Sequence, residues 1–488
     1  MKLIRLFMIF SALSVSLFSN AQLTSFIKTY GNSGYDYGRD IKQDTDTGYV
    51  VTGSSSSFIS SQADVYILKV DQLGNFEWSI NYGGEGSDWG QSIAVTNDST
   101  YAIAGYTNSF GAGGFDFYLL RLDENGQLIW QNTYGGSDWD KAYGLIQTPD
   151  SGFVMAGETY SYDNGNLSAF VVRTDKNGDT LWTYVEEGSS ESFFRDVSIA
   201  GDSIVLAGGF YSSATNSLDG FIKTMHINGS QGGMKTIGQG DDEYFTSVYA
   251  ATGHYNFGGA RAYNFDTEKT NMWNYKMQYD WTEVFDLVYS SNSPEHDQVN
   301  DIVTRYYNED TYFIGQSESW GYQLDGEEDI FMGKCSSGGI YFAANNYGEK
   351  GEDIGQALDN CYDDGVVFLS DTKFFSSGGN NILIMKLDYT WSYPDQFVDM
   401  SNDNITSSIN QENWDIIKVY PNPVHEELYF GKVLQGIISI HDLSGRCVFQ
   451  SEIHKESINL SELESGSYLI AFENYLDGSI SQTQIIKE

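Results

Sequence analysis

The chain has 488 residues, of which 67 are acidic and 26 basic, so its formal net charge at pH 7 is −41. A charge of this sign repels phosphate backbones and argues against nucleic-acid binding. Aromatic residues make up 15% of the chain and 52 glycines stand against 5 prolines, which is typical of β-structure with frequent turns. We interpret the acidic excess as a solvated surface, and divalent-cation sites in the loops are the alternative.

The first 21 residues have the organisation of a signal peptide. Lys2 and Arg5 form a positive segment, residues 6–18 form an apolar core, and small residues precede the predicted cleavage before Gln22. A membrane anchor is the alternative, but the apolar run is short and no other run is long enough to span a bilayer. Residues 1–21 therefore predict export into the periplasm, with no membrane span in the mature chain. Delivery from the periplasm to the extracellular space or the outer-membrane surface needs a further signal.

A repeat dominates residues 22–388. Trp78, Trp130 and Trp182 end three similar segments and are spaced 52 residues apart. In the unit from Gly83 to Trp130 the pattern predicts four strands, which are joined by hairpins and cover 91–96, 100–107, 115–123 and 126–134. Four such strands form one blade of a β-propeller, and a period near 50 residues is typical of propellers or solenoids.

Seven repeat units are present. The predicted third strands are marked by Asp64, Asp116, Ala169, Asp219, Asn271, Asp329 and Asn381. The second strand carries a glycine, which recurs at Gly53, Gly105, Gly157, Gly208, Gly258 and Gly315. Residues 22–388 are therefore predicted to form seven blades of about 52 residues each.

The two ends of the repeat region complement each other. Residues 23–30 read as a fourth strand with no third strand ahead of them, whereas the seventh unit reaches its third strand at 381–388 and lacks a fourth. We expect the N-terminal strand to complete the seventh blade, because a closed ring has no open sheet edges. A solenoid would need no such exchange, so this feature favours a propeller.

The turn before each tryptophan has the form D-x-x-G-x-x-x-W. The aspartate can accept hydrogen bonds from backbone N–H groups of the turn, the glycine supplies a left-handed residue, and the tryptophan is predicted to pack between blades. The turn resembles the Asp-box turns of sialidases and the Trp-docking repeats of quinoprotein propellers, which implies a structural role. The residues concerned are Asp71, Gly74, Trp78, Asp123, Gly126, Trp130, Asp175, Gly178 and Trp182.

One face of the predicted propeller carries the long second-to-third connections and the junctions between blades. Varied loops on a rigid scaffold are where binding usually occurs. The candidate ligand-binding aromatics are Phe58, Phe110, Tyr160, Tyr162, Tyr211, Tyr263, Trp320 and Tyr322, and weak candidates for calcium are Asp36, Asp88, Asp138 and Asp353. In the other interpretation, the aromatics fold back over the loops and the acids cap turns. No other cofactor is predicted.

No catalytic motif stands out. The propeller has three histidines at non-equivalent repeat positions, and the chain has no G-x-S-x-G, no H-E-x-x-H, no phosphate loop and no Cys/His metal spacing. Paired carboxylates, such as those of glycoside hydrolases, stay open because their separations are invisible in a sequence. Cys335 and Cys361 fall in neighbouring repeats, and both a disulfide and two free buried thiols fit that placement.

The amino-acid pattern changes after the propeller. Residues 389–415 are polar and lack the repeat, so they are predicted to be a linker. Residues 416–488 contain seven short alternating strands, a pattern typical of a small β-sandwich.

Several motifs of this last segment occur in the order known from a family. The residues are Pro421, Asn422, Pro423, Asp442, Gly445, Gly466, Tyr468 and Lys487. The segment resembles the C-terminal sorting domain of type IX secretion substrates of the Bacteroidetes. That resemblance implies recognition of residues 416–488 by the type IX machinery, export across the outer membrane, and removal of the domain with surface attachment or release. An ordinary Ig-like module is the alternative.

The sequence thus predicts an all-β protein, a seven-bladed β-propeller closed by the N-terminal strand and followed by a small C-terminal β-sandwich. The predicted function is non-catalytic binding of glycan or protein at the cell surface or outside the cell. The alternatives are a secreted polysaccharide-processing enzyme that uses loop carboxylates and a structural or adhesion component.

Overall fold

The computed structural model divides the chain into two compact units, Met1–Ile405 and Thr406–Glu488. It describes residues 25–31, 34–56, 62–188, 190–214, 216–238, 240, 242–263, 266–289, 296–305, 308–318, 328–339, 341–347, 351–373 and 379–388 of the first unit, and residues 427–430, 435–442, 447–455, 457–461, 463, 466–474 and 480–487 of the second. The predicted signal peptide (1–21) and linker (389–415) lie outside these residues.

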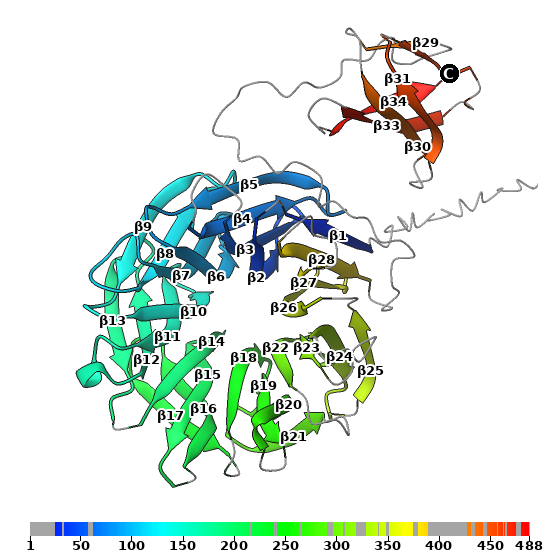
Figure 1. Ribbon diagram of the computed structural model, residues 1–488. Helices are drawn as coiled ribbons and strands as arrows, with labels where there is room; N and C mark the ends of the chain where they lie inside the picture. The colour runs from blue at the N-terminus through cyan, green and yellow to red at the C-terminus, as the bar shows by residue number, and fades with distance from the viewer. Residues whose placement is uncertain are drawn as a thin grey trace, which may run out of the picture. The chain divides into compact units, whose positions relative to one another are not determined.

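The first unit is a ring of seven four-stranded antiparallel sheets, which confirms the predicted seven-bladed propeller (Figure 1). Blades 1 to 3 consist of β2 (Asp36–Gln43), β3 (Tyr49–Ser55), β4 (Asp64–Val70) and β5 (Phe76–Tyr82); β6 (Asp88–Val95), β7 (Tyr101–Thr107), β8 (Asp116–Leu122) and β9 (Leu128–Tyr134); and β10 (Asp140–Gln147), β11 (Phe153–Thr159), β12 (Ser168–Thr174) and β13 (Thr180–Val185). Blades 4 and 5 consist of β14 (Ser192–Ala200), β15 (Ser203–Ser212), β16 (Ser217–His226) and β17 (Gln231–Ile237), and of β18 (Glu243–Ala251), β19 (His254–Tyr263), β20 (Asp266–Gln278) and β21 (Glu283–Tyr289). Blade 6 consists of β22 (Asp297–Thr304), β23 (Thr311–Ser317), β24 (Asp329–Cys335) and β25 (Tyr341–Tyr347).

Blade 7 is built from both ends of the propeller. Its first three strands are β26 (Asp353–Asn360), β27 (Val366–Thr372) and β28 (Asn381–Leu387), and its outer strand is β1 (Phe26–Tyr30). β1 pairs antiparallel with β28, with Phe26 opposite Lys386 and Tyr30 opposite Ile382. The predicted closure of the ring by the N-terminal strand is therefore confirmed.

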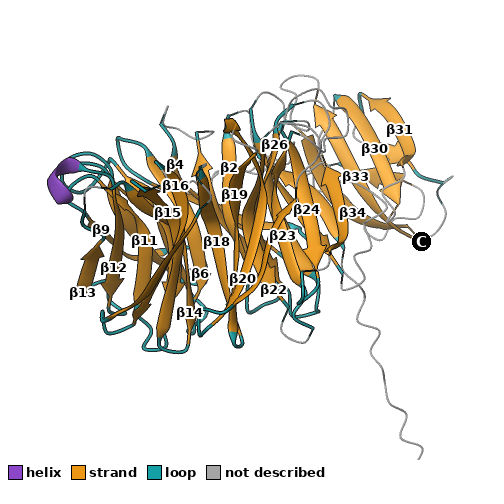
Figure 2. Cartoon of the chain, turned by 90° about the horizontal axis from the view of Figure 1, so that it is seen from below, coloured by secondary structure: helices purple, strands orange, loops and turns teal. Residues whose placement is uncertain are grey.

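Apolar side chains of neighbouring blades meet between the sheets and form the core. Along β8 every residue from Asp116 to Leu122 is buried, because each face of this inner strand packs against another blade. The only helical segment in the described part of the chain is the short 3₁₀ turn η1 (Asp163–Gly165), on the face that carries the second-to-third connections (Figure 2). We call this face the loop face.

The first strand of each blade contains a β-bulge. In blade 2 the register of β6 against β7 shifts between Gly90 and Ser92, and the strand begins at Asp88 rather than at residue 91. A side chain on Gly105 would collide with the Trp89 carbonyl oxygen at this bulge, so the second strand needs a glycine there.

The same register corrects two sequence assignments. In blade 5 the glycine that faces the bulge carbonyl is Gly259, not Gly258, since a side chain on Gly259 would collide with the Tyr244 carbonyl. In blade 3 the residue that pairs as Asp116 does in blade 2 is Ser168, not Ala169. Both errors are shifts by one residue. The first arises because the sequence does not show where the bulge lies. The second is a misalignment of the repeat, since Ser168 lies as far before Trp182 as Asp116 does before Trp130.

The outer rim is held by contacts between the fourth strand of one blade and the turn of the next. The Tyr82 hydroxyl donates to the Gly126 carbonyl over 2.6 Å, and the Trp78 ring packs against Gly126 itself. In that turn Asp123 accepts hydrogen bonds from two backbone N–H groups, and Gly126 has a φ of +78°. Asp71, Gly74, Trp130, Asp175 and Gly178 occupy the corresponding places in neighbouring blades, and Trp182 packs on Gly229 and donates to the Ile227 carbonyl.

The second unit is a small β-sandwich. One sheet has the order β31 (Cys447–Ile453), β30 (Gly436–Asp442), β33 (Gly466–Asn474), β34 (Ile480–Lys487), and the other pairs β29 (Glu427–Tyr429) with β32 (Ser457–Asn459). Ten buried apolar residues, among them Leu428, Ile440 and Phe472, form its core. Residues 416–426 lie outside the described residues.

Candidate functional site

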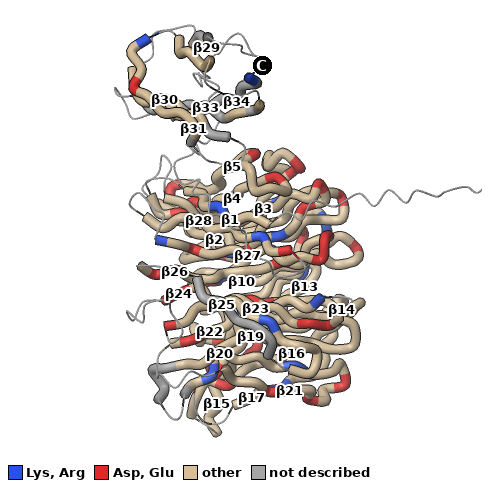
Figure 3. The backbone as a smooth tube through the Cα atoms, turned by 90° about the vertical axis from the view of Figure 1, so that its right-hand side faces the viewer, with Lys and Arg blue, Asp and Glu red and all other residues tan. Residues whose placement is uncertain are grey.

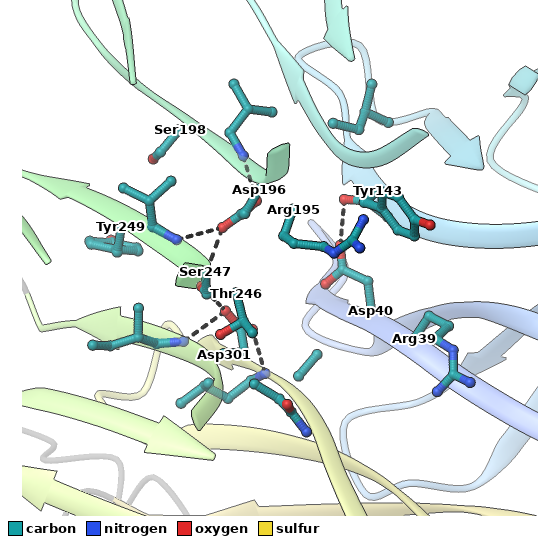
Figure 4. Close-up of a pocket in the computed structure, with 18 of the residues that line it drawn as sticks. Arg39, Asp40, Tyr143, Arg195, Asp196, Ser198, Thr246, Ser247, Tyr249 and Asp301 are labelled. Carbon is teal, nitrogen blue, oxygen red and sulfur yellow. Dashed lines mark hydrogen bonds between the residues drawn. The ribbon is translucent and has the colours of Figure 1, made fainter. Parts of the chain in front are cut away.

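The first strands of all seven blades surround the central channel, which contains a cavity of about 350 Å³ (Figure 4). Each bulge adds a residue to its strand and turns that side chain toward the cavity. We call these seven residues the bulge ring; they are Arg39, Gln91, Tyr143, Arg195, Thr246, Asn300 and Gln356.

Two strand positions before the bulge ring lies a second set of side chains, closer to the loop face because the first strands start there. We call it the mouth ring; it consists of Tyr37, Trp89, Lys141, Phe193, Tyr244, Gln298 and Ile354. The two rings together contain five aromatic and four amide side chains, three cations and no carboxylate.

Arg39 is held by a neighbouring blade. Its Nη1 lies 3.1 Å from Oδ2 of Asp371, and its guanidinium lies 5.4 Å from the centre of the Tyr37 ring. Asp371 also accepts hydrogen bonds from the Gly38 N–H and the Gln356 amide. Burial raises the pKa of Asp371 to about 6, although the positive charge of Arg39 acts in the opposite direction.

Arg195 is fixed in the same way three blades further on. Its Nη1 lies 2.8 Å from Oε2 of Glu158, whose other oxygen accepts from the Tyr143 hydroxyl over 3.0 Å. The guanidinium stacks against Tyr143 and Phe193, each ring centre being 4.2 Å away. These partners hold Arg195 at the side of the cavity (Figure 4).

An arc of aromatic rings follows the mouth from blade 1 to blade 3, with stacked contacts from Tyr35 to Tyr106 and edge-to-face contacts from Tyr106 to Trp139, and we call it the aromatic arc. Successive ring centres along it lie 5.2 to 6.3 Å apart, and its members are Tyr35, Tyr37, Trp89, Tyr106, Phe115 and Trp139. Its two ends are open to solvent, since Tyr35 is 52% and Trp139 48% exposed. Lys141 lies inside the arc, with its Nζ 4.7 Å from the centre of the Trp139 ring.

Carboxylates form the floor of the cavity, one residue beyond the bulge ring. Asp196 accepts a hydrogen bond from the Val248 N–H of the next blade over 2.7 Å, and Asp301 accepts one from the Leu358 N–H over 2.9 Å. Between them the Ser247 hydroxyl lies 3.2 Å from Asp196 and 2.7 Å from Asp301. These acids link blades, and burial together with the charge of Asp301 raises the pKa of Asp196 to about 7.

We expect the propeller to lose stability between pH 5 and pH 8. The raised pKa of Asp196 means that the folded state binds its proton more tightly than the unfolded chain, in which an aspartate has a pKa of about 3.9. The contribution is fully present below the unfolded pKa and is lost as the pH rises through about 7. Asp359 and Asp371, whose pKa values burial raises to about 6, act in the same direction.

Melting temperatures measured from pH 5 to pH 8 test this expectation. Asp196→Asn should make the dependence shallower. It also costs stability at every pH, because the two oxygens of Asp196 accept from the N–H groups of Val248 and Val197 and an amide has only one acceptor oxygen. The slope is therefore the readout, and an equal slope in both proteins would contradict the assignment. Asp40, Lys42 and Asp301 face the same cavity and stay unchanged in this comparison.

The loop aromatics that the sequence suggested as ligand-binding residues lie in different surroundings. Phe110 packs on Tyr118 and Tyr162 on Phe170, with ring centres 5.7 and 5.4 Å apart, so both rings lie against their own blades. Tyr160 is near the mouth, where burial and then the charge of Glu158 raise its pKa. Tyr211 is half-buried at the end of β15, and Phe58, Trp320, Tyr322 and the side chain of Tyr263 lie outside the described residues.

The acids proposed for calcium are placed at the start of first strands. Asp36, Asp88 and Asp353 are buried, and Asp88 accepts hydrogen bonds from Thr107, Ser109 and the Gly84 N–H. The equivalent acid in blade 3 is Asp140 rather than Asp138, which is exposed. In the described part of the chain no group of three or more His, Cys, Asp or Glu residues could hold a metal ion. Cys335 and Cys361 are free and buried.

Sequence reasoning missed the bulge ring, the mouth ring and most of the aromatic arc. In the seven first strands the second and fourth residues, which form the mouth and bulge rings, differ from blade to blade: DYGRDIKQ, DWGQSIAV, DKAYGLIQ, SFFRDVSIA, EYFTSVYAA, DQVNDIVT and DIGQALDN. The seventh and eighth residues differ as much, so variation alone does not single out the residues that face the channel. The second-to-third loops drew attention because they differ in length as well.

In the second unit the described sorting-motif residues gather at one end of a sheet. Asp442 pairs with Tyr468, and Gly466 pairs with Lys487, which is buried. Pro421, Asn422, Pro423 and Gly445 lie outside the described residues.

The second unit matches a known protein family. Residues 418–487 match the family model described as the secretion system C-terminal sorting domain. The chain therefore carries the sorting domain of a type IX secretion substrate, as the sequence predicted. This domain indicates export to the cell surface or the extracellular space and an interaction with the type IX secretion machinery. In the described residues no helix is long and apolar enough to cross a membrane.

The propeller has more distant relatives. The regulatory protein FlaEY of Caulobacter vibrioides is 25% identical over 175 residues, and the match covers 30% of this chain and 18% of FlaEY. The chain thus spans about a fifth of the length of the curated relative that it matches.

Several solved structures are similar in shape. The WD40 domain of Neurospora crassa Pan2 matches with a TM-score of 0.47 and 8% identity, over 75% of this chain and 91% of that chain. The polysaccharide lyase Uly1 gives 0.45 and 10%, and the α-L-arabinanase of Penicillium chrysogenum 0.40 and 12%, each over 75% of this chain and 98% of that chain. Similarities at this level carry no argument about activity.

Proposed function

We propose that this exported propeller is a non-catalytic binding module for a glycan, and that the glycan binds at the channel mouth on the loop face. One observation carries the proposal: the bulge ring lines a cavity of about 350 Å³ with amide, hydroxyl and guanidinium groups, and the mouth ring, with its aromatic faces, lies two strand positions nearer the loop face. Aromatic faces with a few well-placed polar groups are the usual lining of small-molecule sites.

The chemistry of the lining suits a sugar. Sugar rings present apolar C–H faces, which can stack on an aromatic ring such as the half-exposed Trp139 or Tyr35. Their hydroxyls both donate and accept hydrogen bonds. The amides of Gln91, Asn300 and Gln356 can do the same, because each has a carbonyl oxygen and an NH₂ group.

The carboxylates near the cavity support binding rather than catalysis. Glu158 and Asp371 are each paired with an arginine, and Asp196 and Asp301 accept backbone N–H groups that join blades. Groups tied in this way serve the scaffold. A polysaccharide-processing enzyme and a structural surface component are the alternatives, and the experiment below separates them.

A glycan-array screen of the chain without residues 1–21, in the presence and absence of calcium, tests the proposal. We expect saturable binding that does not depend on calcium. Trp139→Ala and Tyr35→Ala should each weaken it by about tenfold, which corresponds to the loss of one stacked ring. Tyr362→Ala is the matched control, because this tyrosine is 69% exposed but lies in the β26–β27 turn on the opposite face.

Each other outcome points elsewhere. Shortened glycan products would favour an enzyme. Absence of binding in both conditions would refute the glycan proposal and favour a protein partner or a structural role. Binding that Trp139→Ala and Tyr35→Ala leave unchanged would refute the placement of the site at the channel mouth.

A further inference from the structure

The charged side chains of the mouth and bulge rings are all basic, although the chain as a whole is acidic, and two of these three cations are paired with Asp371 or Glu158. Acidic residues outnumber basic ones 67 to 26 in the sequence and are spread over the propeller (Figure 3). The mouth and bulge rings nevertheless contain Arg39, Lys141 and Arg195 and no Asp or Glu. A binding surface that excludes the commonest charge of its own chain indicates selection for the charge of the ligand.

The guanidinium groups of Arg39 and Arg195 each have N–H donors that are not used within the described residues. An arginine has five N–H donors. In the described residues, the hydrogen bonds of Arg39 and of Arg195 all come from Nη1, to Asp371 and the Gly38 carbonyl in the first case and to Glu158 in the second. Nε and Nη2 of each side chain are thus available to a ligand, while the stacked rings and the carboxylates hold the guanidinium planes in place.

Lys141 has no anion of its own. Its ammonium makes no hydrogen bond and no ion pair with any residue that the structure describes. It lies 5.4 Å from the ring centres of Tyr106 and Phe115 and 4.7 Å from that of Trp139. Aromatic faces attract a cation but do not neutralise it, so a bound anion would supply the missing charge.

The floor of the cavity limits how deep an anion can go. Asp40, Asp196 and Asp301 follow the bulge ring by one residue, and Lys42 pairs with Asp40 over 2.6 Å. The cation of the floor is thus already paired, so an anionic group is attracted to the two upper rings rather than to the floor. Charges elsewhere on the propeller matter less, because physiological salt screens interactions beyond about 8 Å.

We infer that the mouth of the channel recognises an acidic glycan, whose sugar rings stack on the aromatic arc while its carboxylate or sulfate groups bind Arg39, Arg195 and Lys141. This inference rests on the proposed function and adds the class of the ligand. Arginine donors arranged in a fixed plane suit carboxylates and sulfates alike, so the two kinds of acidic sugar are separate arms of the test.

Titration calorimetry on the chain without residues 1–21 is the experiment. The probes are an oligogalacturonate, a sulfated galacto-oligosaccharide and a neutral galacto-oligosaccharide of the same length. We expect at least one acidic probe to bind about tenfold more tightly than the neutral one at low salt, and this difference to shrink when the salt concentration rises.

Lys141→Gln is the main variant, because it breaks no ion pair within the described residues. It should weaken binding of the acidic probes by about tenfold and change binding of the neutral probe by a clearly smaller factor. Arg195 is tested as the double variant Arg195→Gln with Glu158→Gln, which leaves no buried carboxylate unpaired. Lys235→Gln, on the outer strand β17, is the matched control for a lost positive charge and should change nothing.

The possible outcomes distinguish a failure of the acidic-glycan inference from a failure of the proposed glycan binding. Equal affinity for acidic and neutral probes, or acidic binding that Lys141→Gln does not weaken, overturns the acidic ligand and leaves glycan binding standing. Failure of all three probes in a protein that also binds nothing on the glycan array overturns both.

Discussion

Deletion of residues 22–30 should lower the melting temperature of the propeller by about 10 °C or more. The deletion removes β1, leaves β28 with an unpaired edge and takes Phe26, Ile27 and Tyr30 out of the core. Each of these side chains is at most 8% exposed, and burying one stabilises a protein by about 1.5 to 3 kcal/mol. Their combined loss is comparable to the whole stability of many domains.

Closure also involves a contact at the rim. The Tyr30 hydroxyl donates to the Gly74 carbonyl of blade 1, and the Phe26 ring packs against Gly74, as Tyr82 and Trp78 do at Gly126 between blades 1 and 2. β1 therefore joins blade 7 to blade 1 as well as completing its own sheet.

Scanning calorimetry of the deletion beside two point variants separates these contributions. Tyr30→Phe and Tyr82→Phe each remove one hydroxyl from the same kind of contact, and each should cost only about 1 to 3 kcal/mol. Adding the peptide 22–31 to the deletion variant should restore part of the lost melting temperature. An unchanged melting temperature in the deletion variant would refute the role of β1 in holding the ring closed.

Removal of residues 416–488 should abolish appearance of the propeller at the surface or in the medium of a bacterium with type IX secretion. These residues contain the matched sorting domain, and they belong to a compact unit separate from the propeller. The truncated protein should still fold, because the blades are complete without this segment. It should accumulate in the periplasm.

Fractionation and surface proteolysis measure this effect. Ile440→Asp places a charge in the core of the sandwich and should cause the same defect with a full-length chain, since a buried, unpaired charge is strongly destabilising. Tyr362→Ala, an exposed change in the propeller, is the control and should leave export intact. Normal surface display of the truncated chain would contradict recognition through this domain.

The repeat and the strands were readable from the sequence because they depend on local order. The 52-residue spacing of Trp78, Trp130 and Trp182 and the D-x-x-G-x-x-x-W turns can be read along the chain without knowledge of contacts between distant residues. Closure of the ring could also be predicted, since the N-terminal end of the repeat region has an extra fourth strand and the seventh unit lacks one. The motifs near Asp442, Tyr468 and Lys487 predicted the sorting domain, because each motif is a short continuous stretch of sequence.

The channel mouth was decided only by the tertiary structure. A β-bulge shifts the register by one residue and so determines that Arg39 and Arg195 face the cavity, yet it has no residue signature in these strands. Closure of the ring then joins groups far apart in the chain, such as the Gly38 N–H and Asp371, 333 residues away. The sequence by itself determined the blades and the route of export; which side chains meet at the channel mouth follows from how seven bulged strands converge on one axis.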